Sequence, residues 1–336
     1  MFKNLIIYRI GEGWQADADA VEAELAKTPF QPCEPTQPFA FGWAPPRGAE
    51  HGRLVEVVDG HWLLKLQREQ RLLPGSVVTE RVDELAEQIE HQTGRKPGKK
   101  ARKDLKEQAA HELLPRAFTK TGATRVWIAP AQRLLLVDAG SVARADEVTT
   151  LLTQAIPGLM LHLLQSAESP AACMAAWLMD GDTPEGFQIE RECELKSSDE
   201  QKSVVRYARH ALDIDEVRAH LTSGKMPTRL ALSWKERVAF TLTETLTLKK
   251  ISFLDLAFEG RPEVSGDESF DADLALATGE LGTLIPALIE GLGGEHDFTA
   301  AALGTHASTG PAATAPAAPA AQPSVADAVV VDTPPW

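Results

Sequence analysis

Cysteine is scarce in this sequence of 336 residues. Its three cysteines, Cys33, Cys173 and Cys193, are odd in number and lie far apart, which excludes a framework of disulfide bonds and a paired CxxC metal site. No stretch approaches the roughly 18 uninterrupted apolar residues of a membrane span, and the stretch MFKNLIIYRIGEGW lacks the long apolar core and cleavage site of a secretory signal. A cytoplasmic protein without a membrane partner is therefore expected.

Catalytic signatures are missing as well. The sequence contains no GxSxG, no HExxH and no acidic cluster at metal-binding spacing. The segment 111–115 (HELLP) starts like HExxH but ends in proline. Asp271 and Asp273 could bind magnesium, yet acids at the start of a helix more often interact with its dipole. We therefore expect no catalytic residue, no metal site and no cofactor.

Two glycine-containing segments have to be weighed as nucleotide sites. Residues 11–16 (GEGWQA) match GxGxxA, but Asp17 and Asp19 would repel a phosphate, and antiparallel hairpins follow instead of a parallel βαβ repeat. Residues 94–100 (GRKPGKK) are one residue short of GxxxxGK and have Lys100 where Ser or Thr would hold magnesium. Both segments are interpreted as connections between elements.

What the sequence does contain is an uneven distribution of charge. The formal net charge is −14, but residues 95–125 hold ten Lys or Arg against three acids, so this stretch is +7 and the rest of the chain is −21. An acidic protein repels a polyanion everywhere except at such a patch, so segregated charge favours one oriented binding surface, with nucleic acid as the first partner to consider. The alternative is a solvated helical face beside a flexible basic turn.

Hydrophobic periodicity predicts an α+β fold in which helices are interleaved with antiparallel hairpins and meanders. The apolar segment 159–164 is expected to be a central strand. Strands are predicted at residues 4–10, 39–46, 53–58, 61–67, 125–128, 134–138, 159–164, 187–195 and 204–210 and in a meander over 228–256, and helices at 16–27, 76–94, 100–114, 145–156, 170–179, 214–222 and 271–292.

This pattern divides the chain into four parts. An N-terminal α+β unit covers residues 1–75, a protruding basic helical pair covers 76–115, and a second α+β unit covers 116–295. The remaining residues, 296–336, form an Ala/Pro-rich tail. Such a composition buries too little apolar surface to offset the entropy of ordering, so disorder is predicted over 304–336.

The second helix of the pair has two different faces. Leu105, Ala109 and Leu113 recur at i, i+4 and i+8 and predict a packed side. Another side is basic and carries Lys99, Arg102, Lys103 and Lys106.

Several segments resemble a known family. They are MFKNLIIYRI, FGWAPP, HELLPRAFTKTGATRVWIAPAQRLLLVDAGS, EGFQIERECELKS, LALSWKERVAFTLTETLTLKKISF and FDADLALATGELGTLIPALIEGLGGE. In this order they are similar to RdgC, the bacterial recombination-associated protein family. The resemblance runs from Met1 to about Glu295, and the LLPRAF and EGLGGE segments are its most specific parts.

The resemblance implies a nucleoid-associated protein that forms a ring-like homodimer around duplex DNA, binds largely without regard to sequence and restrains a RecA-type recombinase by competing for DNA. By local match, the family's positions on the inner face of the ring become Arg95, Arg116, Arg209 and His210, and Phe118 is interpreted as a dimer contact. The resemblance and the charge pattern together give the candidate DNA-binding residues, which are Arg95, Lys96, Lys99, Lys100, Arg102, Lys103, Lys106, Arg116, Lys120, Arg206, Arg209 and His210.

Two points stay open from the sequence. Arg206 and Arg209 lie within one predicted strand, where residues 206, 208 and 210 face one way and 207 and 209 the other, so the two arginines cannot line the same flat face. The alternative function is an acidic adaptor whose basic helix docks on a protein such as the recombinase. Salt dependence distinguishes the two, because phosphate contacts release counterions whereas a protein interface buries apolar anchors.

Overall fold

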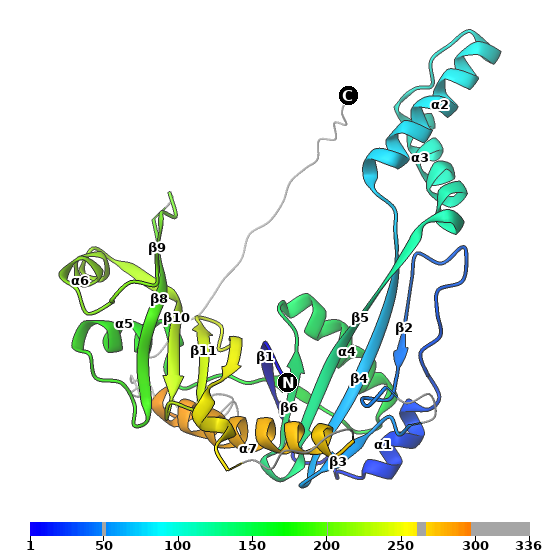
Figure 1. Cartoon of the computed structure of the whole chain (residues 1–336). Coiled ribbons are helices and arrows are strands. Elements are labelled where there is room, and N and C mark those ends of the chain that lie inside the picture. The colour runs from blue at the N-terminus through cyan, green and yellow to red at the C-terminus, as the bar shows by residue number, and fades with distance from the viewer. Residues whose placement is uncertain (49–51, 200, 261–266, 297–336) are drawn as a thin grey trace, which may run out of the picture. The chain divides into compact units, whose positions relative to one another are not determined.

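The computed structural model describes residues 1–48, 52–199, 201–260 and 267–296, and Met1–His296 form one compact unit. Its fold is mixed, with helices packed on a large antiparallel sheet (Figure 1). The helices among the described residues are α1 (Ala18–Leu25), α2 (Gly75–Thr93), α3 (Lys99–Leu113), α4 (Val142–Ala155), α5 (Pro170–Asp180), α6 (Asp215–Thr222) and α7 (Asp267–Gly291), with short 3-10 helices η1 (Leu114–Arg116), η2 (Pro130–Gln132) and η3 (Asp255–Phe258).

Twelve strands form one sheet in the order β2-β4-β5-β6-β1-β12-β11-β10-β8-β9, with β3 paired to β4 and β7 to β1. The pairings between these strands are antiparallel, which confirms the predicted mixture of helices with antiparallel strands. The strands are β1 (Leu5–Ile10), β2 (Phe39–Trp43), β3 (Glu56–Val58), β4 (His61–Leu72), β5 (Phe118–Ala129), β6 (Leu134–Asp138), β7 (Leu161–Leu163), β8 (Phe187–Ser197), β9 (Val204–Ala208), β10 (Lys225–Trp234), β11 (Val238–Thr243) and β12 (Leu248–Phe253).

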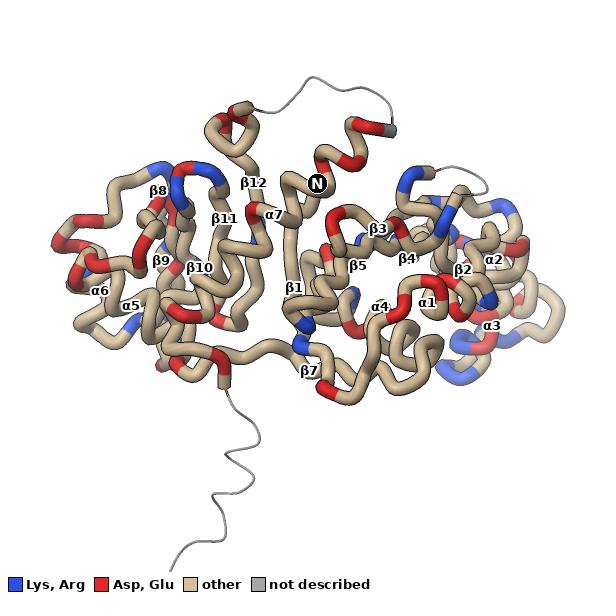
Figure 2. The backbone as a smooth tube through the Cα atoms, turned by 90° about the horizontal axis from the view of Figure 1, so that it is seen from below, with Lys and Arg blue, Asp and Glu red and all other residues tan. Residues whose placement is uncertain are grey.

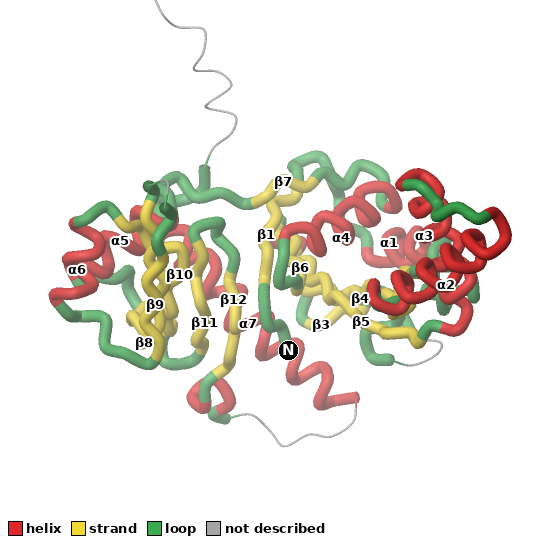
Figure 3. The backbone as a smooth tube through the Cα atoms, turned by 90° about the horizontal axis from the view of Figure 1, so that it is seen from above, coloured by secondary structure: helices red, strands yellow, loops and turns green. Residues whose placement is uncertain are grey.

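The central strand β1 places alternate side chains in two separate cores. Ile6, Tyr8 and Ile10 pack with α1 and α4, while Leu5 and Ile7 pack in a core that also contains buried residues of α5, α6 and α7. Since successive side chains of a strand point to opposite faces, α1 and α4 cover one face of the sheet here and α7 covers the other. Figure 3 shows these helices around the strands.

The last helix, α7, is apolar as well as long. Residues 268–291 would be long and apolar enough to cross a membrane by length and composition alone. Its Leu281, Leu284 and Leu288 are buried in the core against the sheet, and Glu280 forms an ion pair of 2.6 Å with Arg237. Packing in the core therefore accounts for its hydropathy.

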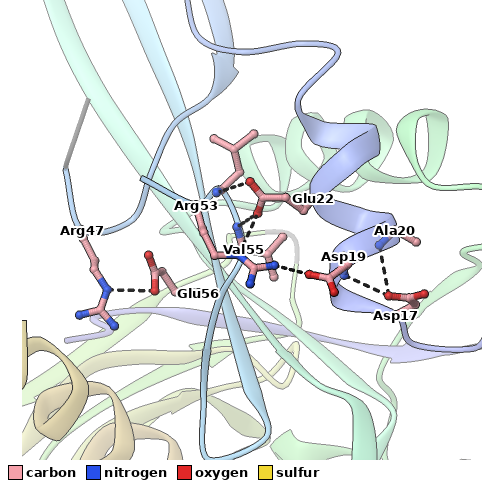
Figure 4. Close-up of polar contacts among 9 residues, drawn as sticks. Asp17, Asp19, Ala20, Glu22, Arg47, Arg53, Val55 and Glu56 are labelled. Carbon is pink, nitrogen blue, oxygen red and sulfur yellow. Dashed lines mark hydrogen bonds and ion pairs between the residues drawn. The ribbon is translucent and has the colours of Figure 1, made fainter. Parts of the chain in front are cut away.

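Helix α1 is fixed to the sheet by a polar network (Figure 4). The Asp17 carboxylate caps the helix by accepting hydrogen bonds from the backbone N–H groups of residues 19 and 20. The Glu22 carboxylate accepts from the backbone N–H groups of Leu54 and Val55 at 2.9 and 2.7 Å, and Arg53 pairs with Asp19. These bonds tie α1 to the segment that leads into β3.

The helical pair α2 and α3 follows the end of the β4–β5 ribbon. The last residues paired between these strands are Leu72 and Phe118, and both helices lie beyond this point (Figure 1). Helix α2 ends at Gly94, which adopts the left-handed conformation that favours glycine. Both predicted helices and the turn between them are confirmed.

Several predicted strands are wrong in position or bounds. Strand β2 ends at Trp43 instead of residue 46, β3 begins at Glu56 instead of residue 53, and β4 continues to Leu72 beyond residue 67. The segment 159–164 is not a central strand, because β7 (Leu161–Leu163) is short, exposed or half-buried, and paired only at the side with β1. Strand β5 starts at Phe118, not at Arg125. Strand β9 ends at Ala208 instead of His210. The predicted disordered tail lies outside the described residues, and the division into units at residues 75 and 115 stays a prediction.

Candidate nucleic-acid interface

Helix α3 presents cations to solvent and apolar side chains to α2. Leu105 and Ala109 are buried in a small core with α2. On another side of α3, Lys99, Lys103 and Lys106 are exposed, and none of them forms an ion pair with a described residue. The two-faced helix predicted from the sequence is therefore present.

Part of the basic stretch is neutralised by α2. The Arg102 guanidinium lies 2.9 Å from the Asp83 carboxylate, and the Lys96 ammonium lies 3.9 Å from that of Glu90. Helix α2 carries five acids and one arginine, whereas α3 carries five cations and three acids. Figure 2 shows Lys and Arg positions beside Asp and Glu positions in this part of the molecule. The charge of residues 95–125 alone does not include these acids, because the stretch begins after α2 ends.

An apolar surface adjoins the base of the helical pair. The side chain of Phe118 is 86% exposed, and its partner across the strands is Leu72, which is also exposed. Phe39 and Phe41 on β2 are exposed and stack with ring centroids 6.1 Å apart. Exposed large apolar side chains gathered in this way are typical of a protein contact, which agrees with the prediction of Phe118 as a dimer contact without testing it.

Basic candidates flank this apolar surface. Lys120 lies opposite Gln70, which in turn lies opposite Phe39, so the three side chains share one face of the sheet. Lys120 is exposed, as is Arg116 in η1. Neither cation forms an ion pair with a described residue, so both are available to an anionic partner. Arg95 and Lys100, in and after the turn between α2 and α3, are exposed and likewise form no ion pair with a described residue.

The remaining candidates belong to the other edge of the sheet. Arg206 lies on β9, the strand at one end of the sheet. Helix α3 connects to β4 and β5, which lie next to β2 at the opposite end. Arg209 lies after β9 with a left-handed φ of 56°, and the His210 ring Nδ1 lies 2.7 Å from the carbonyl oxygen of Ala211. The alternation expected for Arg209 and His210 is not observed, because both residues lie beyond the end of β9. Within one chain the candidates therefore form two separate groups.

Two cations that sequence reasoning did not include share a sheet face with Arg206. Arg229 on β10 lies near Glu194, the partner of Arg206, and Lys250 on β12 pairs with Glu192. Strand alternation could have placed these side chains on one face, but only the pairing of the strands shows that they are neighbours.

The titratable groups of the described residues were considered as metal ligands and nucleophiles. Within the described ranges, no group of three or more His, Cys, Asp or Glu residues is arranged to hold a metal ion. Burial raises the pKa of the Cys173 and Cys193 thiols to about 11, which keeps them protonated and poorly nucleophilic at neutral pH. Asp271, considered above as a magnesium ligand, is an ion-pair partner of Arg47.

Comparison with known proteins agrees with the resemblance noted in the sequence. Residues 1–295 match the model of a family described as "Putative exonuclease, RdgC". The chain is 46% identical over 299 residues to a recombination-associated protein RdgC of Dechloromonas aromatica, and 45% and 42% identical over 296 residues to proteins of that name from Cupriavidus necator and Janthinobacterium sp.. Each alignment covers 88% of this chain and 98% of the relative. The chain therefore belongs to the RdgC family of recombination-associated proteins.

Proposed function

We propose that this protein binds duplex DNA without regard to sequence, encircles it as a ring-like homodimer and limits a RecA-type recombinase by occupying its DNA. The observation that carries this proposal is the row of exposed cations on α3, Lys99, Lys103 and Lys106, which form no ion pair with a described residue, in a chain of net charge −14. Side chains of this kind contact phosphates, which are the same in every sequence. Membership of a recombination-associated family supports the link to recombination.

The proposed ring follows from the separation of the basic groups and from the exposed aromatic side chain. One group lies around α3 and Arg116, and the other lies around Arg206 at the far edge of the sheet. A second copy joined through the apolar surface at Phe118 would bring both groups of both chains around one duplex. The protein is then expected in the cytoplasm, associated with the nucleoid.

A titration against duplex DNA tests the binding itself. Gel shifts with two unrelated duplexes of equal length, each at several salt concentrations, are expected to give similar affinities that fall together as salt rises, because bound phosphates release counterions. A large preference for one duplex over a shuffled competitor would contradict sequence-independent binding. An affinity that does not change with salt would contradict phosphate contacts.

The effect on the recombinase is tested by strand exchange in a purified system. We expect the protein to slow the reaction, and additional duplex to restore it, because the inhibition arises from occupied DNA. Inhibition that persists in a large excess of duplex would contradict competition for DNA.

That last result would favour the second candidate, an acidic adaptor that binds the recombinase directly. The observation in its favour is the mixed charge of the helical pair, in which Asp83 of α2 already pairs with Arg102 of α3. A protein partner could contact both the cations of α3 and the exposed apolar side chains of Phe118 and Leu72.

The proposal contains no catalytic step, although the family description includes the word exonuclease. Incubation of an end-labelled duplex with the protein and either magnesium or manganese is expected to release no nucleotides. Release that depends on the protein and persists through further purification would contradict this part.

A further inference from the structure

One face of the sheet carries a row of charged side chains across β9, β8 and β10. In the strand register, Arg206 lies opposite Glu194, and Glu194 lies opposite Arg229. Directly opposite residues of antiparallel strands project from the same face. The Arg206 Nε lies 2.5 Å and a terminal nitrogen of Arg229 lies 4.0 Å from one carboxylate oxygen of Glu194, so the two guanidinium groups share a single carboxylate.

A second ion pair crosses the same face. The Lys250 ammonium on β12 lies 2.6 Å from the Glu192 carboxylate on β8, although β11 and β10 separate these strands. Neighbouring strands lie about 4.8 Å apart, so β12 and β8 would be about 14 Å apart in a flat sheet. The long Lys250 and Glu192 side chains span this separation above β11 and β10, so the charged side chains of β9, β8, β10 and β12 lie on one continuous face.

The opposite face of these strands is the packed one. Leu195 of β8 and Leu230 and Leu232 of β10 are buried in the core that contains residues of α5, α6 and α7. The charged row lies on the other side, and its cations reach solvent: the exposed fractions of the side chains are 72% for Arg206 and 53% for Arg229. Glu194 is only 14% exposed, because the arginines and the Thr228 hydroxyl, which donates a hydrogen bond of 2.9 Å, surround it.

We propose that this charged face is a second phosphate-contacting surface, and that Glu194 and Glu192 hold its cations in the free protein and release them to DNA phosphates on binding. The proposal rests on the duplex-binding function proposed above. Its network has three cations and two carboxylates, so it retains positive charge for an anionic partner. A guanidinium that pairs with a carboxylate can pair with a phosphate in the same way.

The exchange is energetically feasible because the cations are exposed and the Lys250–Glu192 pair is open to solvent on both sides, while Glu194, which is largely covered, keeps its hydrogen bond from the Thr228 hydroxyl when a guanidinium turns to a phosphate. Exposed ion pairs contribute little to stability, at most about a fivefold factor in an equilibrium each. Phosphates of a bound duplex can therefore replace the carboxylates. The carboxylates still compete for the same cations, so Glu194 lowers the affinity for DNA and Arg229 raises it.

Single substitutions separate these effects. Glu194→Gln keeps the size of the side chain and an acceptor for Thr228 but removes the charge, and it should tighten duplex binding roughly two- to fivefold. Arg229→Gln should weaken binding and reduce the slope of log affinity against log salt by about 0.9, the loss of one phosphate contact. Glu185→Gln is the matched control, because Glu185 is an exposed acid before the start of β8, at the end remote from Glu194.

The outcomes distinguish this proposal from the function on which it rests. If the unsubstituted protein fails to bind duplex DNA, the proposed function itself fails. If it binds but Glu194→Gln, with an unchanged melting temperature, binds equally or more weakly, the exchange is refuted. Tightening by Glu185→Gln of the same size would show a general charge effect and would also refute it. If Glu194→Gln does not fold, Arg229→Gln provides the test. An affinity and a salt slope equal to those of the unsubstituted protein would then refute the proposed phosphate-contacting surface.

Discussion

Neutralising three lysines of α3 should remove phosphate contacts without damaging the fold. Lys99, Lys103 and Lys106 are exposed and form no ion pair with a described residue, and the apolar side of α3, with Leu105 and Ala109, is unchanged by their replacement. Since Gln is a good helix former, the triple Lys→Gln variant should keep its melting temperature and its oligomeric state.

The magnitude follows from counterion release. Each phosphate neutralised on a duplex contributes about 0.9 to the slope of log affinity against log salt, so three lost contacts reduce it by up to about 2.7. Fluorescence anisotropy with a labelled duplex at five or more salt concentrations measures the slope. The matched control replaces the same lysines by Arg, which keeps the charge and should leave the slope nearly unchanged.

Arg102 provides an internal comparison, because its guanidinium already pairs with Asp83. Arg102→Gln should change the slope less than any one of the three lysines, and Asp83→Asn should increase affinity by freeing Arg102. A triple Lys→Gln variant that folds, dimerises and shows an unchanged slope would refute the assignment of α3 to DNA. The DNA surface would then have to lie around Arg116 and Arg206.

Three further predictions concern assembly, the tail and pH. Phe118→Ala should convert the dimer to monomer at micromolar concentration in light scattering while leaving the melting temperature unchanged, because the side chain is 86% exposed in one chain; a dimer of undiminished stability would contradict the assigned contact. Removing residues 304–336, which contain no Lys or Arg, should leave the melting temperature and DNA affinity unaltered, and a marked fall in melting temperature would show that the tail completes the fold. Burial lowers the pKa of His61, whose Nδ1 lies 3.2 Å from the Trp127 indole nitrogen, so at pH 7 the folded protein holds the neutral imidazole, which accepts this hydrogen bond. The stability that this group contributes is present above the unfolded pKa of about 6.5 and is lost as pH falls towards the lower pKa of the folded state. The free energy of unfolding, measured with urea, should therefore fall less between pH 7 and 5 in His61→Gln than in the unsubstituted protein. An equal fall in both would rule out His61 as the source.

The regular elements were predictable where local chemistry specifies them. The Asp59-Gly60 pair predicts a hairpin, and both residues have positive φ, with Val58 opposite His61 in the register. The first half of β5 was missed, because FTKTGA has no alternation of apolar and polar residues and is exposed along its whole length. It is extended because it pairs with β4, which the sequence of β5 alone does not show.

The candidate site was likewise predictable only where local sequence determines which side chains are neighbours. The cations of α3 were identified correctly as a solvent-exposed face, because helical period fixes which side chains are neighbours. The acids beside them come from α2, and the carboxylate of Glu194 reaches Arg206 and Arg229 through strand pairing. Such contacts depend on tertiary structure, so a count of charge along the sequence overestimates how many cations are free.

The central claim, that a closed dimer surrounds the duplex, is tested most directly by the topology of the DNA. The protein is loaded at low salt on a covalently closed circular duplex and on the same duplex cut once, and both are washed at a salt concentration that dissociates phosphate contacts. A ring predicts retention on the circle and loss from the linear form, because a closed dimer can leave only at a free end. Equal loss from both forms while the protein remains dimeric would contradict encirclement.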